Sequence, residues 1–418
     1  MTMMKAIKKT SNIFTVIDIG NNKVSCLIGT SVKTNDVQVK VLGFGQHASI
    51  GISNGLITNM NEIANSIARA VEGAETMAGF PIEKVVCSLS GGRPITKIIR
   101  NHLKIDSGRI VKSDLIKIHK INNLIDIDNY TPLSITPIKY YIDKNSPVDN
   151  PIGMHTDNLT LDTSIIYGKK NVMQNFSSAI ELCHLSAEKF IISPEASGMS
   201  TMTKDEREHG AIVIDLGGNI TSIGVFINDK IVFSDSIPIG GIHITSDIVR
   251  GLGTKSEDAE KIKILYGSAL SNETDEYTSI EIPIISDEGE IINQEIPRAM
   301  LTAIIKPRIE ETFELVKERL NYFKRNSNFS NKVILCGGGA NLNNIREFAS
   351  TFLETNVRIG RPIGLIGLPE IVQTPTFSCL AGLLIKSLEG EKFPIEQQMN
   401  LGLFSYLGRI GNWFDKNL

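Results

Sequence analysis

One short pattern occurs twice in this chain and constrains its fold more than any other feature. Residues 16–29 read VIDIGNNKVSCLIG, and residues 213–226 read VIDLGGNITSIGVF. Each copy has an apolar run, a short polar turn and a second apolar run, which is the pattern of a β-hairpin. The first run ends on an aspartate both times, Asp18 and Asp215. The repeat predicts two duplicated α/β domains that face a common cleft.

Length and charge agree with a protein of more than one globular domain. The 418 residues exceed the usual size of a single hydrophobic core. The net charge of -3 argues against broad, nonspecific binding to nucleic acid, which requires a basic surface. No run approaches the roughly 18 apolar residues of a membrane-spanning helix, and no signal-peptide core follows the basic N-terminus. We therefore expect no transmembrane segment.

The cysteines are odd in number and scattered, and no two of them have CxxC spacing. This argues against a disulfide framework and against a zinc site. Most of them lie among apolar neighbours, where a buried and unreactive thiol is expected. The pattern favours a reducing, cytosolic compartment. The five are Cys26, Cys87, Cys183, Cys336 and Cys379.

Between the two hairpins the sequence pattern changes twice. Apolar residues at helical spacing predict a helix over residues 61–79, with Asn61 available as its cap and Gly79 at its end. From 95 to 162, short strand-like runs among frequent Asn, Asp and Pro residues indicate an inserted small α/β subdomain. A strand of the first domain is expected to resume at residue 163.

The two repeated turns have the chemistry of a phosphate site. Consecutive backbone N–H groups in a short turn form an anion-binding nest, and glycine permits close approach by a ligand. An aspartate at the strand end can hold water around Mg²⁺, because that ion keeps much of its hydration shell. One such turn from each domain could grip a polyphosphate from both sides. The alternative is that Gly20 and Gly217-Gly218 merely make hairpin turns.

A third glycine-rich element, LCGGGANLNNI, occupies residues 335–345. Three glycines after a buried strand and before a helix let that helix begin close to a planar ligand. Such a turn occurs in many α/β folds and is a weak signal by itself. It is not a P-loop, because the chain has no GxxxxGKS or GxxxxGKT sequence.

The order of these elements resembles the actin/Hsp70/sugar-kinase nucleotide-binding superfamily. The two hairpins are followed by AEKIKILYG, CGGGANL and TFSCLAGLL. Within that superfamily the chain resembles the FtsA family of bacterial cell-division proteins. The more specific matches are IPIGGIHITSDIVRGLGTKSEDAEKIKILYGSAL, RAMLTAIIKPRIEETFELV and VRIGRPIGL. The resemblance runs from about Phe14 to the end of the chain and is weakest in 95–165 and 271–297.

The resemblance implies an α/β, actin-like fold. Two duplicated ribonuclease-H-like α/β domains would surround a nucleotide cleft, and each would carry a small inserted subdomain. The expected division is a first core at 1–94 and 163–193, an inserted subdomain at 95–162, a second core at 194–245 and 301–386, a small subdomain of the second half at 246–300, a linker at 387–402 and an amphipathic helix at 403–418.

The resemblance also implies ATP and Mg²⁺ as ligands. Asp18 and Asp215 would approach the Mg²⁺ ion, most simply through water. Glu260 and Lys263 would flank the adenosine, although a solvated helix face is the alternative for this pair. The remaining nucleotide contacts would come from the first turn (Gly20, Asn21, Asn22 and Lys23), the second turn (Gly217, Gly218 and Asn219), the ribose side (Gly241) and the glycine-rich element (Gly337, Gly338 and Gly339).

Two departures from the family pattern bear on phosphate chemistry. Asn21 and Asn22 stand where the family commonly has small hydroxyl residues, so a hydroxyl contact to phosphate is absent while the backbone nest can remain. Related filament proteins often place a carboxylate just before the proline of FIISPEASG. This chain has Ser193 there and Glu195 just after the proline. A general base must lie within about one water of its proton, so Glu195 is only a weak candidate and binding is expected rather than rapid hydrolysis.

The C-terminal stretch is amphipathic and follows a segment that reads as a tether. Its apolar side suits the interface of a bilayer, and its glycines weaken the helix in water. The alternative is a helix docked on the body of the protein. The residues expected to enter the membrane are Phe404, Leu407, Ile410, Trp413 and Phe414.

By resemblance, the chain is an ATP-binding protein that assembles into head-to-tail filaments. It would tether FtsZ to the cytoplasmic face of the cell membrane at the division septum and recruit later division proteins. The C-terminal peptide of FtsZ would dock on residues 246–300. Arg298 could pair with an acidic peptide there, unless it is an ordinary surface arginine.

Two other classes remain open at this point. A small-molecule kinase or phosphatase of the same fold would need an aspartate base at a substrate pocket, and the sequence offers no convincing one. A cell-shape or pilus-assembly actin-like protein is nearer, although the insert at 95–162 favours the division family.

Overall fold

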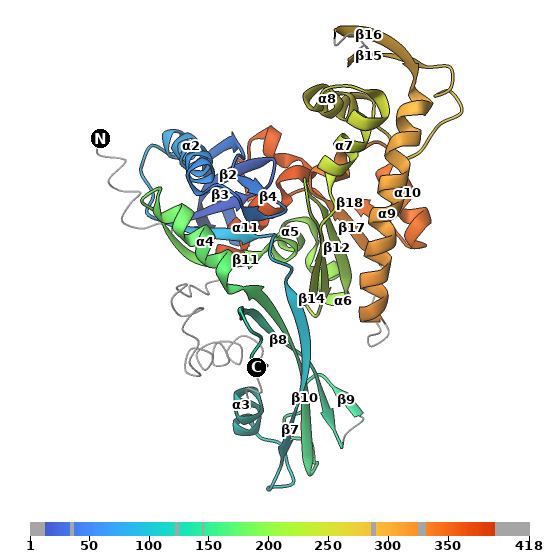
Figure 1. The fold of residues 1–418 in the computed structure, drawn as a ribbon. Helices are drawn as coiled ribbons and strands as arrows, with labels where there is room; N and C mark the ends of the chain where they lie inside the picture. The colour runs from blue at the N-terminus through green and yellow to red at the C-terminus, as the bar shows by residue number, and fades with distance from the viewer. Residues whose placement is uncertain are drawn as a thin grey trace.

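The computed structural model describes residues 13–33, 37–121, 125–143, 146–285, 290–324 and 332–388. Two helix-covered central sheets form its body, and a smaller sheet extends away from them (Figure 1). None of the helices in these ranges is long and apolar enough to cross a bilayer. The amphipathic stretch at 403–418 lies outside the described residues, and with it Phe404, Leu407, Ile410, Trp413 and Phe414.

The first hairpin forms the centre of a six-stranded sheet. Its first strand, β1 (Ile13–Ile19), pairs antiparallel with β2 (Lys23–Lys33) and parallel with β6 (Lys84–Leu89). The strand order is β11-β6-β1-β2-β3-β19, in which β3 is Val37–Ala48, β11 is Ser186–Ile192 and β19 is Leu365–Ile366. The predicted hairpin is therefore confirmed, and Asp18 is the next-to-last residue of its first strand.

The second hairpin is built into its sheet in the same way. The strand β12 (Ala211–Leu216) pairs antiparallel with β13 (Thr221–Ile227) and parallel with β17 (Val333–Cys336). The strand order is β14-β13-β12-β17-β18, where β14 is Lys230–Ile237 and β18 is Val357–Ile359. Because both hairpins share this pairing scheme, the predicted duplication is confirmed.

Two helices in direct contact join the halves. The helix α5 (Ser193–Thr201) packs against α11 (Ser378–Leu388), and each also contacts strands of the central sheets. A Cβ atom on Gly382 would lie only 1.7 Å from the carbonyl oxygen of Ala196. Glycine is required at this crossing, because any side chain would push the two backbones apart.

The predicted helix over 61–79 is α2 (Met60–Ala78), which buries Ile63 and Ile67 against the first sheet. The expected cap at Asn61 is wrong. Asn59 is the cap, because its side chain accepts hydrogen bonds from the backbone N–H groups of Asn61 and Glu62. Asn61 already lies in the first turn of the helix, where it donates one of these bonds.

The inserted segment forms a subdomain with its own sheet and helix. The sheet has the order β7-β10-β8-β9, and α3 covers one of its faces. The strand β10 runs without interruption to Lys169, so the expected boundary at residue 163 falls inside a strand of the inserted sheet. Its elements are β7 (Ile95–Lys104), α3 (Lys112–Lys120), β8 (Tyr130–Ile142), β9 (Ser146–Val148) and β10 (Asn158–Lys169).

A second group of helices and a hairpin lies beside the second sheet, at the opposite end of the molecule from the insert (Figure 1). Its long helix buries apolar residues along one side, as their spacing predicts, including Ile305, Phe313 and Leu320. The elements are α7 (Gly241–Leu252), α8 (Ser256–Tyr266), β15 (Ser279–Ile285), β16 (Ile291–Pro297) and α9 (Arg298–Lys324).

Smaller elements complete the description. The short strands β4 (Ile52–Ser53) and β5 (Leu56–Ile57) form a tight hairpin before α2. The helix α4 (Lys170–Glu181) follows the insert, α6 (Lys204–His209) precedes the second hairpin, and α10 (Ile345–Leu353) follows the glycine-rich element. All five cysteines are free thiols; four are buried, and Cys183 is half-buried.

Candidate functional site

The two repeated turns have the same internal hydrogen bond and touch each other. In the first turn the N–H of Gly20 donates to the carbonyl of Lys23, at 3.0 Å. In the second turn the N–H of Gly217 donates to the carbonyl of Ile220, also at 3.0 Å. A Cβ atom on Gly218 would lie 2.7 Å from the side-chain oxygen of Asn22. The fold therefore brings the two predicted phosphate turns together, one from each half.

The tip of the β4–β5 hairpin contacts both turns. The N–H of Gly55 donates to the side-chain oxygen of Asn21 at 3.0 Å. On the other side, the Asn219 amide donates to the Asn54 side chain at 3.4 Å. Asn21 thus uses its side chain to hold a neighbouring loop, which gives this departure from the family pattern a structural role.

Asp18 lies at the end of β1 beside a serine of the next parallel strand. The Ser88 hydroxyl donates to Asp18 Oδ1 at 2.7 Å and accepts from the N–H of Ile19 at 3.2 Å. Burial raises the pKa of Asp18, and the Ser88 hydrogen bond, the charge of Lys23 and the Cys379 thiol oppose that rise. The carboxylate is therefore held in place but poorly compensated in charge.

Asp215 has a matching environment in the second half. The Ser197 hydroxyl of α5 donates to its Oδ2 at 2.7 Å. Burial raises the pKa of Asp215 to about 6, the Ser197 hydrogen bond opposes this, and the negative charge of Asp18 adds to the rise. Two carboxylates that repel each other within one site create a demand for a cation.

The donor set fits Mg²⁺ held through water. Asp18 and Asp215 would supply oxygen ligands, and this ion usually keeps several waters and takes only one or two carboxylates from the protein. Within the described ranges, no cluster of three or more His, Cys, Asp or Glu residues could bind a metal directly. Water and a phosphate-bearing ligand would have to complete the shell.

Lys23 brings a positive charge to the first turn. Its ammonium group lies 3.3 Å from the centre of the Phe377 ring, which is a cation–π contact. Burial lowers the pKa of Lys23 to about 8, and the charge of Asp18 opposes that shift. The lysine is thus a partly dehydrated cation beside Asp18.

The second turn is joined to the N-terminus of α7. The N–H groups of Gly241 and Ile242 donate to the carbonyls of Gly217 and Gly218, at 3.0 Å and 2.8 Å. Two of the N–H groups that a helix leaves unpaired at its start are satisfied in this way. The position of the second turn therefore depends on the position of α7.

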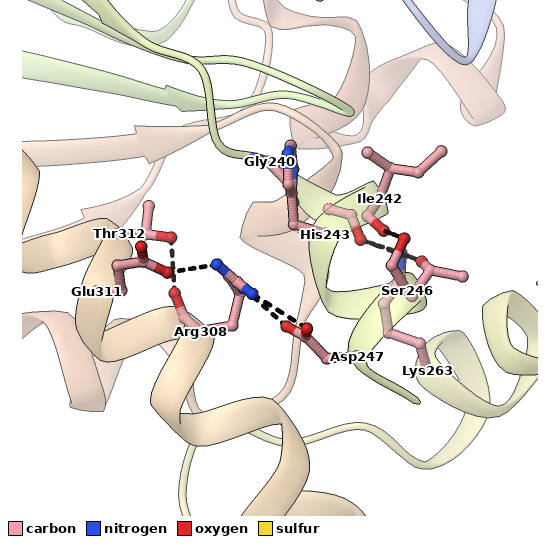
Figure 2. A network of polar contacts seen from close by, with 11 residues as sticks. Gly240, Ile242, His243, Ser246, Asp247, Lys263, Arg308, Glu311 and Thr312 are labelled. Carbon is pink, nitrogen blue, oxygen red and sulfur yellow. Dashed lines mark hydrogen bonds and ion pairs between the residues drawn. The ribbon is translucent and has the colours of Figure 1, made fainter. Parts of the chain in front are cut away.

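Lys263 and Glu260 belong to a polar network on α7 and α8, of which Figure 2 labels Lys263. Lys263 Nζ donates to the Gly241 carbonyl at 3.0 Å, to Thr245 Oγ1 at 2.8 Å and to Glu260 Oε2 at 2.6 Å. The Lys263 side chain is only 13% exposed. The lysine is therefore largely enclosed at the start of α7, and the alternative of a solvated helix face does not describe it.

A second ion pair fixes α7 to the long helix (Figure 2). Arg308 of α9 donates from Nε and Nη2 to the two carboxylate oxygens of Asp247, at 2.7 Å and 3.0 Å. The same guanidinium also bonds Glu311. A paired, fork-like contact of this kind sets the orientation of both helices as well as their distance.

The three glycines of the third element differ in their surroundings. Gly337 has a φ of +82°, and a Cβ atom on it would lie 2.3 Å from Asp215 Oδ1. A Cβ atom on Gly339 would lie 2.8 Å from the Leu216 side chain, whereas one on Gly338 would meet nothing within 4 Å. Gly337 and Gly339 thus serve close packing against β12, and Gly338 faces open space.

The two residues of FIISPEASG that bear on hydrolysis have different partners. The Ser193 hydroxyl lies 2.7 Å from the Ser90 hydroxyl. Glu195 forms an ion pair with Lys386 of α11, at 3.6 Å. The position just before the proline, where the resemblance led us to look for a carboxylate, is therefore occupied by a serine that pairs with a second serine.

Arg298 is the first residue of α9, and part of its guanidinium group contacts neighbouring residues of the protein. Its Nε donates to the Tyr266 carbonyl at 3.2 Å, and Nη1 lies 3.8 Å from the buried carboxylate of Asp275. The surrounding subdomain also carries exposed large apolar side chains, namely Ile264, Leu265, Tyr277, Ile285, Ile291, Ile292 and Met300.

Several residues of the site were not anticipated. Ser88 and Ser197 hold the two aspartates, and Phe377 and Cys379 lie against Lys23 and Asp18. Ser88 could have been found, because it ends a strand parallel to β1 and the ends of parallel strands meet at one edge. The others come from helices distant in sequence and leave no local signal.

Comparison with known proteins places the chain in a family. It is 32% identical to "Cell division protein FtsA" of Rhizobium meliloti (strain 1021) over 422 residues, which cover 98% of this chain and 96% of the relative. This chain belongs to the FtsA family. The FtsA relatives of Neisseria meningitidis serogroup B and Escherichia coli K12 are 32% and 28% identical, again over 98% of this chain and over 100% and 99% of the relatives.

Family models match the second half and the inserted subdomain of this chain. The model "Cell division protein FtsA" matches residues 212–382, and the model "SHS2 domain inserted in FTSA" matches residues 91–167. The second match extends past residue 163, in agreement with the continuous strand β10.

Solved structures confirm the actin-like fold that the resemblance implied. The "PilM-PilN type IV pilus biogenesis complex" aligns with a TM-score of 0.63 over 90% of this chain and 98% of that chain. MreB5 of Spiroplasma citri, solved bound to ADP, aligns with a TM-score of 0.53 over 94% of this chain and 99% of that chain. Each is 14% identical, so the likeness concerns the fold alone.

Proposed function

We propose that this chain is an ATP-binding, actin-like cell-division protein that tethers FtsZ filaments to the cytoplasmic membrane at the division septum. The observation that carries the nucleotide part is the meeting of two matched turns, each with its own aspartate, from opposite halves of the molecule. Membership of the FtsA family supports the division role. The recruitment of later division proteins follows from the same family.

The nucleotide would lie between the halves, with its phosphates at the two turns. The turns offer backbone N–H groups as an anion nest, and Lys23 adds a cation. Mg²⁺ would neutralise phosphate charge when bound, and Asp18 and Asp215 would hold its water. Gly338, whose open side is free of other atoms, leaves space for the base and α-phosphate. An ADP-bound protein of the same fold, MreB5 of Spiroplasma citri, supports this ligand class.

Hydrolysis in this site would be weak at most. The position expected to carry a carboxylate holds Ser193, whose hydroxyl bonds Ser90. Glu195 is engaged by Lys386. Hydroxyl groups do not accept a proton from water near neutral pH as a carboxylate or imidazole does. The site is therefore better suited to binding ATP than to hydrolysing it.

The FtsZ peptide would dock on residues 246–300. Exposed Ile264, Leu265 and Met300 supply apolar contact area, which a peptide needs at the centre of its interface. Arg298 keeps part of its guanidinium free of the Tyr266 carbonyl and can pair with an acidic residue of the peptide.

The membrane contact would come from residues 403–418, behind the linker at 387–402. Head-to-tail assembly of the chain would place many such segments on one surface. Each one contributes modest affinity, and a row of them binds with avidity.

Co-sedimentation with vesicles tests this proposal. Full-length protein and a chain ending at Ser387 are mixed with FtsZ and lipid vesicles, with and without MgATP. The full chain should carry FtsZ into the pellet, and the shortened chain should leave both proteins in the supernatant. Membrane binding by the shortened chain would overturn the tether. Failure of the full chain to bind MgATP in calorimetry would overturn the nucleotide site.

A further inference from the structure

The edge strand of the second sheet, β14, is covered by the inserted subdomain. An edge strand exposes backbone N–H and C=O groups that a neighbouring strand would normally satisfy. In Figure 1 the strands β7 and β10 pass beside β14 on their way from the body into the insert. Contacts between β14 and three strands of the inserted sheet, β7, β8 and β10, confirm this arrangement.

Two hydroxyl side chains of the inserted sheet satisfy the β14 edge. Thr96 Oγ1 donates to the carbonyl of Ser234 at 2.8 Å and accepts from the N–H of the same residue at 3.0 Å. Ser164 Oγ donates to the carbonyl of Val232 at 2.6 Å. Thr96 thus makes both hydrogen bonds that an adjacent strand would make to Ser234. We refer to the contacts of Thr96 and Ser164 with β14 as the hydroxyl clasp.

Charged and apolar contacts reinforce the clasp along β14. Asp235 lies near Arg93, just before β7, and pairs with Arg319 of α9 at 3.6 Å. At the other end of the strand, burial and, to a lesser extent, the nearby positive charge of Lys230 lower the pKa of His119 in α3 to about 4. The side chain of Ile138 packs against the core of the second half. The insert therefore faces β14 over most of its length.

The clasp connects parts of the chain that belong to different halves. The insert leaves the first half after β6 and returns to it at α4, so its covalent links are to the first half alone. Its hydrogen-bonded partner is the second half. The strand β14 pairs with β13, which begins at Thr221 directly after the second turn, and it leads into α7, which holds that turn.

We propose that the inserted subdomain is a brace between the two halves, and that the hydroxyl clasp slows the separation of the two turns. Opening of the cleft would move β14 away from β7 and β10 and break the bonds of Thr96 and Ser164. A nucleotide gripped by both turns would leave more slowly while these bonds hold. The proposed role of the insert as a brace depends on the proposed nucleotide site. The hydrogen bonds of the hydroxyl clasp do not depend on it.

The test compares the full-length chain with the double variant Thr96→Val, Ser164→Ala. Both changes remove a hydroxyl with little change in shape. Without nucleotide, the Ser234 amide of the double variant should exchange its hydrogen about tenfold faster than in the wild type, because its N–H loses the Thr96 hydroxyl as acceptor. Stopped-flow release of a fluorescent ATP analogue with Mg²⁺ should then be about three- to tenfold faster than in the wild type.

Two further variants serve as controls. Thr160→Val removes a buried hydroxyl of the same sheet, one that bonds His102 inside the insert. It should leave both measurements unchanged. Thr96→Ser keeps the hydroxyl, so the exchange of its Ser234 amide and its rate of nucleotide release should match those of the wild type. This variant remains informative even if the double variant folds poorly.

The outcomes separate the two proposals. Unchanged exchange of the Ser234 amide in the double variant would overturn the clasp. Faster exchange with an unchanged release rate would overturn the brace. A wild-type chain that binds no nucleotide would overturn the proposed function and the brace with it, while the clasp is still decided by the exchange of Ser234.

Discussion

The ammonium group of Lys23 lies 3.3 Å from the centre of the Phe377 ring, and burial lowers the pKa of the lysine to about 8. The aromatic ring holds the charge in a position where little water can solvate it. Phe377 follows β18 by many residues and precedes α11, so a distant segment positions the cation of the first turn. Lys23 is therefore ready to meet an anion without first losing a full hydration shell.

Replacing Lys23 by methionine should weaken MgATP binding by about 10- to 100-fold, because a charge-assisted contact to phosphate is lost. In the wild type the affinity should also fall as the pH rises through about 8, since the lysine then loses its proton. Calorimetry at pH 7 and pH 9 measures both effects. Lys84→Met, at an exposed lysine of β6, is the matched control. Wild-type affinity in the Lys23 variant would contradict the assignment.

Asp215→Asn should change the pH dependence of stability. The pKa of this carboxyl is raised from 3.8 to about 6 on folding, so between these values the folded state holds a proton that the unfolded state has lost. The free energy of unfolding therefore falls as the pH rises through this window. The variant has no carboxyl to titrate here, so its free energy of unfolding should not fall in this window. At pH 7 without Mg²⁺ its free energy of unfolding should therefore exceed that of the wild type by on the order of 2 kcal/mol.

Urea denaturation of both proteins at pH 4 and pH 7 measures the effect of Asp215→Asn. If the free energy of unfolding changed with pH equally in wild type and variant, Asp215 would not be the group whose pKa rises on folding. The same variant should bind MgATP more weakly, because one carboxylate no longer holds the water of the ion.

Glu195→Gln should leave phosphate release from ATP within about twofold of the wild type, because the ion pair with Lys386 keeps this carboxylate from acting as a base. The change should cost at most about 1 kcal/mol of stability, as for other partly exposed ion pairs. A phosphate-release assay with a coupled fluorescent sensor measures the rate. A large fall in the variant would restore Glu195 as the general base.

Asn21→Ala should free the tip of the β4–β5 hairpin. The N–H of Gly55 loses its acceptor, so its hydrogen exchange should rise about three- to tenfold. Asn54→Ala removes the contact of the same tip with Asn219 and should leave the Gly55 amide protected. An unchanged Gly55 amide in the Asn21 variant would mean that the hairpin is held by other contacts.

Arg298→Ala should weaken binding of the FtsZ C-terminal peptide by about tenfold, as expected for loss of one charge-assisted contact. Fluorescence anisotropy of a labelled peptide measures the affinity. Arg346→Ala, at an exposed arginine of α10, is the control for general charge effects. If the wild type and the Arg298 variant bound the peptide with equal affinity, Arg298 would act only as a structural partner of Asp275.

The sequence predicted the parts of the site that local pattern determines. The hairpins could be recognised because their apolar runs and turn residues are contiguous, and their recurrence placed Asp18 and Asp215 in equivalent positions. The cap of α2 was missed by two residues, because Asn59 and Asn61 are equally good caps and only the backbone geometry distinguishes them. The strand at 163 was recognised, but its membership of the inserted sheet depends on pairing with distant β7 and β8.

The remainder depends on tertiary contacts that no local pattern records. Lys263 occupies a helix position that suits a solvated lysine, and its three acceptors are fixed by how α7 meets α8. Thr96 and Ser164 read as ordinary strand residues, and only the fold brings them to the edge of β14. In each case the partner lies on another element, so the role follows from packing.

The crossing of Gly382 with Ala196 has a mechanical consequence. The C-terminal 30 residues leave the described structure from the end of α11, so a force applied to the C-terminus enters the protein along this helix. Because the backbone of α11 is in direct contact with α5 in the interior, the load reaches the centre of the molecule and not a peripheral loop. Cys379, in the first turn of the same helix, lies beside Asp18. A pull on the tail would thus be transmitted to the residues around Asp18.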